Sequence, residues 1–397
     1  MEGEKRMRYD FETLIPRKNM GSRKWDVMAQ HNPDAAEDVI PLSVADMEFK
    51  NPPELAEGLK DYIDHSILGY TMPNNAFYES VVRWMKDRHQ WEIKPDWLVQ
   101  APGVVNALFG IVKTFTEPGD GVIIMQPVYY PFSMAITQNG RELVNNALIY
   151  EDHTYRIDFD DLEKKAKDPK NKMLILCSPH NPIGRVWTRE ELEKVGRICI
   201  DNHVLVVSDE IHFDFVLTGH KHTVFANISE EFAQNSIICT APSKTFNIAG
   251  LKISNIVIPN DGLREKLLEK NRRDFASNSL GIQACRICYD RCGAWKDEML
   301  CMIEYNYQQV KKFIEEKLPQ IQVIDLQGTY LLWLDCTALG LSDRDLEKLT
   351  LSADLYLDEG YLFGPGGSGF ERINLACPTR YLMAAMERFQ KAVVALK

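Results

Sequence analysis

The chain contains a series of short apolar runs, each followed by polar or turn-forming residues. The runs are GVIIM (121–125), MLILC (173–177), VLVVS (204–208), SIICT (236–240) and ISNIVI (253–258). Runs of this length are typical of strands that a parallel sheet buries on both faces. Patterns with helical periodicity lie between them, such as 188–203, where Thr188 and Glu191 fit a capping box. The alternation predicts an α/β architecture with helices on both faces of the sheet.

The pattern changes near residue 290. One long amphipathic helix follows, and then strand-like segments at 322–326, 330–336 and 372–376, with the Gly-rich stretch GPGGSGF (364–370) before the last of them. These features predict a second, smaller α+β domain at the C-terminal end of the chain.

Charge and cysteine usage narrow the class of protein. The net charge of −11 comes without basic clusters, which argues against nucleic acid and anionic membranes as partners. No apolar run approaches 18 residues, and the first residues lack the apolar segment of a secretory signal, so we expect no membrane span and no export. Nine scattered cysteines then indicate reduced thiols in a cytoplasmic protein. Cys285, Cys288 and Cys292 share a helix face, and we interpret them as buried apolar side chains rather than metal ligands.

Polar side chains follow the predicted strands at the point where each one ends. They are Tyr129 and Tyr130, His180 and Asn181, Asp209, Glu210 and His212, and Ser243 and Lys244. Ligands of open parallel sheets bind beyond the carboxyl ends of the strands, so we expect these groups to converge. His180, His212 and Asp214 could also form a metal site, but we expect no metal, because another chemistry explains the set.

A lysine, a carboxylate and an aromatic ring suit pyridoxal 5′-phosphate. The amine can form a Schiff base with the cofactor aldehyde, the carboxylate can hold the pyridine nitrogen protonated, and the aromatic ring can stack on the pyridine. The helix predicted after Gly103 offers backbone N–H groups to a phosphate. Each group also has an ordinary explanation: a lone lysine is usually a solvated charge, Asp209-Glu210 could cap a helix, and Asn181-Pro182 could be a plain turn.

The ordered set of motifs resembles a known family. SPHNPIGRVWTREEL, SDEIHFDF, APSKTFNIAGL and RINLACP resemble pyridoxal-phosphate enzymes of the class I/II aminotransferase superfamily. KWD, VADMEF and ILGYTMPN are similar to the branch of cystathionine β-lyases and other carbon–sulfur lyases that MalY and PatB typify. The resemblance implies the pyridoxal-phosphate-dependent transferase fold, with a mainly parallel seven-stranded sheet in a large domain (50–290). It also implies a small α+β domain formed by residues 1–49 and 291–397.

The resemblance also implies a role for each matching residue. Catalysis is expected of Lys244, which carries the cofactor, and of Tyr129, which stacks on the ring; Tyr130 is the alternative stacking residue. The other residues expected to contact the cofactor are Asp209, Asn181, Gly103, Val104, Val105, His212, Ser243, Lys252 and Tyr70. The substrate α-carboxylate is expected to bind Arg372, whose guanidinium fits a two-pronged pair, together with Asn181 and Tyr70. Tyr70 is expected to reach the active site of a second subunit, which implies a homodimer.

Three positions depart from the usual pattern of the superfamily. Ala241 stands where many relatives have Ser, and Thr240 or Ser243 could compensate for it. Lys252 stands where many aminotransferases have an Arg, so the positive charge is kept but the two-pronged guanidinium is lost. His212 replaces the Tyr of aminotransferases, a change shared with the carbon–sulfur lyases.

The resemblance implies α,β-elimination from an amino-acid substrate such as cystathionine or a cysteine conjugate. The products would be pyruvate, ammonia and a thiol. Transamination is the main alternative, and a regulatory protein that keeps the fold without catalysis is a further one.

Overall fold

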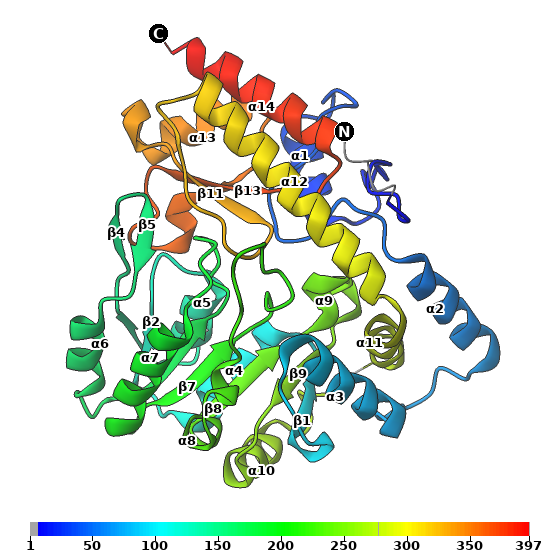
Figure 1. Ribbon diagram of the computed structural model, residues 1–397, viewed down its shortest axis with the longest axis vertical. Coiled ribbons are helices and arrows are strands. Elements are labelled where there is room, and N and C mark those ends of the chain that lie inside the picture. Colours follow the sequence, from blue (N-terminus) through cyan, green and yellow to red (C-terminus); the bar gives the residue numbers. More distant parts are fainter. Residues whose placement is uncertain (1–6, 277, 397) are drawn as a thin grey trace.

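The computed structural model describes residues 7–276 and 278–396. Its largest sheet has seven strands in the order β1-β9-β8-β7-β6-β2-β3 (Figure 1). The strands are β1 (Leu98–Ala101), β2 (Gly121–Ile124), β3 (Glu142–Asn145), β6 (Asn171–Cys177), β7 (Leu205–Asp209), β8 (Ser236–Thr240) and β9 (Ser254–Val257). The pairs between β3, β2, β6, β7 and β8 are all parallel. The predicted α/β fold with a mainly parallel seven-stranded sheet is therefore confirmed.

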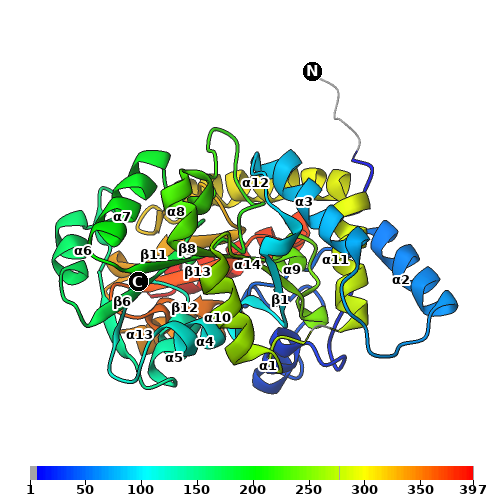
Figure 2. The same ribbon diagram turned by 90° about the horizontal axis from the view of Figure 1, so that it is seen from below.

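Helices cover both faces of this sheet (Figure 2). One face carries α4 (Val104–Phe115), α5 (Pro131–Thr137) and α10 (Asp261–Asn271), and the other carries α6 (Phe159–Ala166), α7 (Arg189–Asp201) and α8 (Glu230–Gln234). Side chains of each strand alternate between the two apolar cores: Ile175 packs on the α4 side and Leu176 on the α7 side. Burial on both faces explains why the central strands are apolar throughout.

The strand β9 runs against its neighbours. It is antiparallel to both β8 and β1, although its sequence matches the other apolar runs. The connection from β8 contains only the short helix α9 (Pro242–Thr245) and a 3-10 turn (Ala249–Leu251). Such a short connection cannot cross to the other end of the sheet, so the chain turns back and β9 runs antiparallel beside β8. The start of β9, rather than its end, therefore lies at the edge where the polar residues gather.

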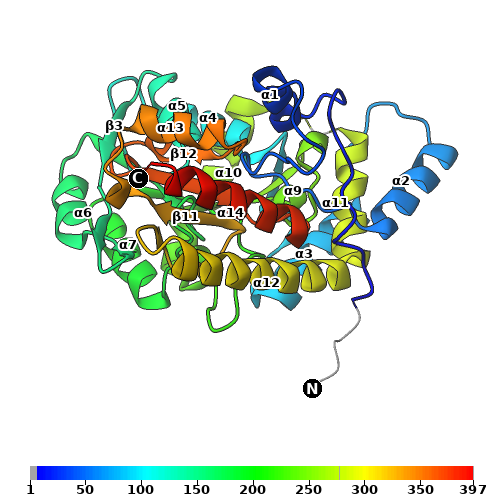
Figure 3. The same ribbon diagram turned by 90° about the horizontal axis from the view of Figure 1, so that it is seen from above.

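A second sheet has four antiparallel strands in the order β10-β11-β13-β12. They are β10 (Gln322–Val323), β11 (Leu331–Asp335), β12 (Asp358–Glu359) and β13 (Phe370–Asn374). The helices of this region are α12 (Gly293–Lys317), α13 (Asp343–Ser352) and α14 (Thr379–Val394), and α12 and α14 lie side by side beyond β11 (Figure 3). An N-terminal segment joins this sheet, because Asn374 N–H donates to Leu42 O at 2.9 Å and Glu48 N–H donates to Ala376 O at 2.8 Å.

We propose that the chain divides into a large domain, residues 50–290, and a small domain formed by residues 1–49 and 291–397. Residues 1–6, 277 and 397 lie outside the part that the structure describes. The support comes from the hydrogen bonds of Leu42 and Glu48 to the second sheet and from the break between α11 (Ser279–Arg291) and α12.

Some local predictions are confirmed and some elements were not anticipated. The capping box at the start of α7 is present: Glu191 N–H donates to Thr188 Oγ1 at 3.2 Å, and Thr188 N–H donates to Glu191 Oε2 at 2.8 Å. The sequence did not predict α1 (Arg23–His31), the polar edge strand β3, or the hairpin of β4 (Ile149–Glu151) and β5 (Thr154–Arg156). In the part of the chain that the structure describes, no helix has the length and apolar character needed to cross a membrane.

Candidate active site

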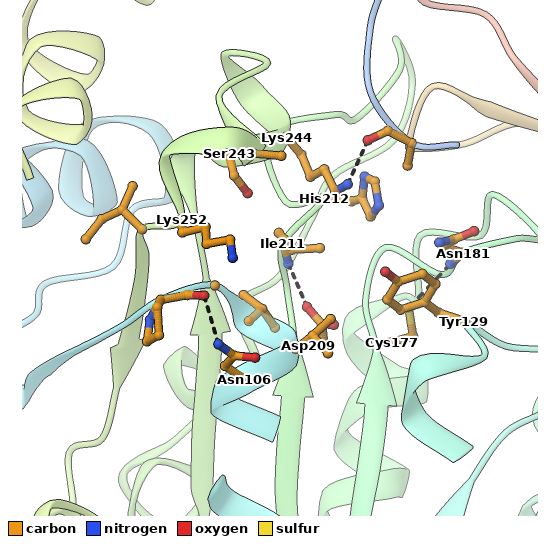
Figure 4. Close-up of a pocket in the computed structure, with 17 residues that line it drawn as sticks. Asn106, Tyr129, Cys177, Asn181, Asp209, Ile211, His212, Ser243, Lys244 and Lys252 are labelled. Atoms are coloured by element: carbon orange, nitrogen blue, oxygen red, sulfur yellow. Dashed lines mark hydrogen bonds between the residues drawn. The ribbon is translucent and has the colours of Figure 1, made fainter. Parts of the chain in front are cut away.

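A cavity of about 170 Å³ lies at the edge of the large sheet where the parallel strands end (Figure 4). The structure brings most of the predicted site residues to it: Gly103, Val104, Val105, Tyr129, Asn181, Asp209, His212, Ser243, Lys244 and Lys252. Arg372 and Tyr70 do not line it. Ala45, Pro102, Asn106, Cys177, Ile211, Ala249 and Ile253 complete the lining, and the sequence analysis had assigned none of these seven to the site.

Lys244 enters the cavity from α9, the four-residue helix after β8. Its Nζ donates a hydrogen bond of 2.7 Å to the carbonyl oxygen of Ala45. Burial lowers the pKa of the amine to about 8, although the carboxylates of Asp46 and Asp209 favour its charged form. The amine is therefore neutral in a substantial fraction of molecules near neutral to mildly alkaline pH, as a nucleophile or a base must be.

Asp209 is the last residue of β7 and is 4% exposed. Its Oδ1 accepts a hydrogen bond from Ile211 N–H at 3.1 Å, but none of the ion pairs between described residues includes this carboxyl. Burial raises its pKa to about 7, and Lys244 lowers it by less. A buried carboxylate without a paired cation suits a ligand that brings a positive charge or an N–H group.

The N-terminal end of α4 forms one wall of the cavity. Gly103 precedes the helix with φ +100°, a conformation that L side chains rarely adopt. Ala107 N–H makes the first helical hydrogen bond, to Gly103 O at 3.2 Å. The N–H groups of Val104, Val105 and Asn106 come before that bond and have no partner within the helix. The arrangement suits an anion at the helix terminus.

Asn181 connects the cavity to Arg372 on β13. Arg372 Nη1 donates to Asn181 Oδ1 at 2.8 Å, and Nη2 donates to the carboxylate of Asp358. The guanidinium carbon lies 4.8 Å from the ring centroid of Phe363, and Nε is buried with no hydrogen-bond partner among the described residues. The two prongs of Arg372 are thus held by Asn181 and Asp358. The sequence had placed Arg372 near the site but gave no sign of Asp358.

Two aromatic side chains line the cavity beside Asn181 and Lys244. Tyr129 is half-buried, and burial raises its pKa above the usual range, so the phenol is protonated. His212 is 3% exposed, and burial lowers its pKa well below the usual value, so the imidazole is neutral. Its Nδ1 has no partner among the described residues. Tyr130, the alternative stacking residue, lies outside the lining and packs near Phe363.

Tyr70 lies far from the cavity of its own chain. It is fully exposed in the connection between α2 (Pro53–His65) and α3 (Asn75–His89), at the right-hand edge of Figure 1. Ile67 and Met72 beside it are 93% and 84% exposed.

The motifs KWD and VADMEF meet in a buried ionic network behind Ala45. Lys24 Nζ lies 3.0 Å from Asp46 Oδ1 and 2.7 Å from Glu48 Oε1, and Trp25 Nε1 donates to Glu48 Oε2 at 3.0 Å. The sequence offered a signal, since both motifs were singled out, but it did not show that this segment supplies the acceptor for Lys244.

Of the three residues considered as metal ligands, His180 and Asp214 have other partners, and His212 lines the cavity. His180 contacts Met125 O at 3.2 Å, and Asp214 pairs with His89 at 3.0 Å. Cys285, Cys288 and Cys292 are fully buried in and after α11, as the sequence predicted. Within residues 7–276 and 278–396, no group of three or more His, Cys, Asp or Glu side chains is arranged to hold a metal ion.

The comparison with protein families decides which family this is. The model of the family described as Aminotransferase class I and II matches residues 37–389. The chain belongs to the class I and II aminotransferase family. The resemblance that the motifs indicated is therefore confirmed, and the family relationship covers both sheets.

Within this family, the chain is similar to carbon–sulfur lyases. Cystathionine beta-lyase PatB of Bacillus subtilis is 42% identical over 97% of this chain and 100% of the relative. Cystalysin of Treponema denticola, whose structure contains a pyridoxal 5′-phosphate cofactor, has a TM-score of 0.97 and 49% identity, with 98% of this chain and 100% of that one covered. The pyridoxal-phosphate-bound C–S lyase of Staphylococcus hominis has a TM-score of 0.90 and 30% identity, with coverage of 97% and 98%.

The raised pKa of Asp209 predicts a pH-dependent stability for the protein freed of bound small molecules. Because its pKa rises from 3.8 to about 7 on folding, the folded state holds the proton more tightly than the unfolded state. This carboxyl therefore lowers stability progressively as the pH rises from about 4 to about 7. The Asp209→Asn protein should lose less stability than the wild type as the pH rises through this range. The measurement is the melting temperature of both proteins at each pH. Identical pH profiles for the two proteins would contradict the assignment.

Proposed function

We propose that this protein is a pyridoxal 5′-phosphate-dependent carbon–sulfur lyase that eliminates a thiol from cystathionine or related cysteine derivatives. The observation that carries the proposal is the cavity in which the amine of Lys244, the buried carboxyl of Asp209 and the N-terminal end of α4 meet. The similarity to PatB and to the C–S lyase of Staphylococcus hominis supports the choice of reaction.

The cavity fits the cofactor through the chemistry of its groups. Asp209, which has no cation paired with it among the described residues, complements a pyridinium N–H. The N–H groups of Val104 and Val105 and the hydroxyl of Ser243, which line the same cavity, complement a phosphate, and Lys252 supplies a positive charge. Tyr129 would cover the ring, Asn181 would donate an N–H to the phenolic oxygen, and Lys244 would hold the aldehyde carbon.

When bound, the cofactor supplies an electron sink for the bonds at the substrate Cα. The protein supplies the proton transfers and the geometry. Asp209 would keep the proton on the pyridine nitrogen, since an opposite charge beside its carboxylate favours the ionised form that burial disfavours. Lys244 Nζ, with its pKa lowered to about 8, takes the proton from Cα.

Arg372 and Asn181 orient the substrate. Arg372 is buried and ion-paired with Asp358, and it also holds Asn181 Oδ1, so the amide and the guanidinium move as one unit. We assign the substrate α-carboxylate to this unit, with one guanidinium prong turning from Asp358 to the substrate. Fixing the carboxylate would set the rotation about the N–Cα bond, so that the Cα–H bond faces Lys244 Nζ. The thiolate would then leave from Cβ once rotation about Cα–Cβ aligns the Cβ–S bond with the electrons released at Cα. His212 stays neutral beside Lys244 and adds no competing charge.

Product analysis tests the reaction type. With L-cystathionine as the sole substrate, we expect equal amounts of pyruvate, ammonia and homocysteine without any keto acid. Lys244→Ala should lower the rate by at least about 10²-fold, because the same amine moves the Cα proton. L-Glutamate with a keto acid is the matched control. Turnover that requires the keto acid, with its amino acid accumulating, would identify an aminotransferase and contradict the proposal.

We propose further that the protein works as a homodimer in the cytoplasm, with Tyr70 completing the partner's site. The connection 66–74 exposes Ile67, Leu68, Tyr70 and Met72, an apolar surface that one subunit leaves uncovered. Tyr70 cannot contribute to its own cavity from this position. All nine cysteines are free thiols and eight are buried, which suits a reducing compartment.

Subunit complementation tests the shared site. Lys244→Ala and Tyr70→Phe chains should each be weakly active. A refolded equimolar mixture should recover about a quarter of the wild-type activity, because half of the dimers are hybrids and each hybrid has one intact site. The control replaces the Tyr70→Phe chain with one that carries both substitutions. Recovery equal to that of this control, or sedimentation of the active protein as a monomer, would contradict the shared site.

A further inference from the structure

Asp214 lies behind the active site and accepts hydrogen bonds from two other parts of the fold. Trp84 Nε1 on α3 donates to Oδ1 at 3.1 Å, and His89 Nε2 at the end of α3 lies 3.0 Å from the same oxygen. Thr245 Oγ1 on α9 donates to Oδ2 at 2.6 Å. Asp214 is 3% exposed, so these donors replace solvent at both carboxylate oxygens.

The bond from Thr245 ties Asp214 to the helix that carries Lys244. Thr245 directly follows Lys244, and α9 has only four residues, too few to hold its own orientation. Two side-chain bonds fix it from opposite sides: Lys244 Nζ to Ala45 O at 2.7 Å in the cavity, and Thr245 Oγ1 to Asp214 behind it.

The donors on the far side of Asp214 are themselves held rigidly. Trp84 stacks on Tyr289 with ring centroids 4.8 Å apart, and His89 stacks on Phe213 at 4.0 Å and an angle of 10°. Burial opposes the charge of Asp214, but the contacts from His89, Lys296 and Thr245 outweigh it and lower the pKa of the carboxyl. The anchor is therefore a charged acceptor, which makes stronger hydrogen bonds than a neutral one.

The segment after β7 faces two ways. Asp209, Ile211 and His212 line the cavity, whereas Glu210 and Asp214 point away from it. Glu210 also pairs with a buried histidine, His222 at 2.8 Å, but its other donors are Ser208 Oγ and Phe225 N–H. Of these two buried carboxylates, only Asp214 bonds to α9.

We propose that Asp214 is a positioning residue, which acts through Thr245 to hold Lys244 Nζ in the cavity against Ala45. The inference rests on the proposed role of Lys244. The carboxylate does not touch the reacting atoms. It fixes the short helix, and the fixed helix keeps the amine in the buried environment that makes it a base near neutral pH.

The test measures the amine itself. In the full-length chain without added pyridoxal phosphate, the pKa of Lys244 is read from the pH dependence of its acylation, followed by mass spectrometry. The wild-type value is expected near 8. Thr245→Val and Asp214→Asn should move it toward the ordinary value of 10.5, because a loosened α9 exposes the amine to water. Thr245→Ser, which keeps the hydroxyl, should retain the wild-type value.

A matched variant separates positioning from general stability. Glu210→Gln removes the other buried carboxylate of the segment, so it should lower the melting temperature without moving the pKa of Lys244. In the loaded enzyme, Thr245→Val should lower kcat at least about tenfold with little change in KM, and Thr245→Ser should restore it.

The proposal would be overturned if the pKa of Lys244 stayed unchanged in folded Thr245→Val and Asp214→Asn proteins. It would also be overturned if Glu210→Gln shifted the pKa of Lys244 by the same amount as these two variants. The titration needs neither cofactor nor turnover. A chain that failed to bind pyridoxal phosphate would therefore refute the proposed function and leave this result readable.

Discussion

The site depends on burying an acid and an amine in the same cavity without letting them pair. Burial raises the pKa of Asp209 to about 7 and lowers that of Lys244 to about 8, so each group is poised near neutral pH. The fold achieves this by ending β7 at Asp209 and starting α9 just after β8, the next strand in the sheet. The carboxyl of Asp209 therefore remains available to a ligand with a positive charge. The amine of Lys244 bonds only to the carbonyl oxygen of Ala45 among the described residues, and a substrate or cofactor can replace that bond.

The segment around Ala45 joins the two halves of the site. Its carbonyl accepts from Lys244 Nζ and from Tyr330 Oη at 2.9 Å. Val44 before it has φ +56°, a strained conformation for a β-branched residue. Both of its backbone groups are held, N–H by Asp358 Oδ2 and C=O by Asn374 Nδ2, each at 2.8 Å. Since Asp358 also pairs with Arg372, one strained segment connects the amine to the group assigned to the substrate carboxylate.

The parts of this arrangement that could be predicted follow from local patterns. The apolar runs predicted the central strands, and the polar residues just after these runs included Asp209, Asn181 and Lys244. The direction of β9 and the edge strand β3 were missed, because an apolar run does not reveal its direction and an edge strand is partly polar. The acceptor of Lys244, the Arg372–Asp358 pair and the Thr245–Asp214 bond join residues 199, 14 and 31 positions apart. No sequence period encodes such contacts, so only the folded chain shows them.

The central claim is that Lys244 is the residue that bonds to pyridoxal phosphate, and reductive trapping tests it most directly. The loaded protein is reduced with borohydride, digested and analysed by mass spectrometry. The account predicts a single pyridoxyl label on the peptide that contains Lys244. Lys252 lines the same cavity and provides an internal comparison. A label on Lys252 or on another lysine, or a cofactor-loaded protein that yields no label, would contradict the account.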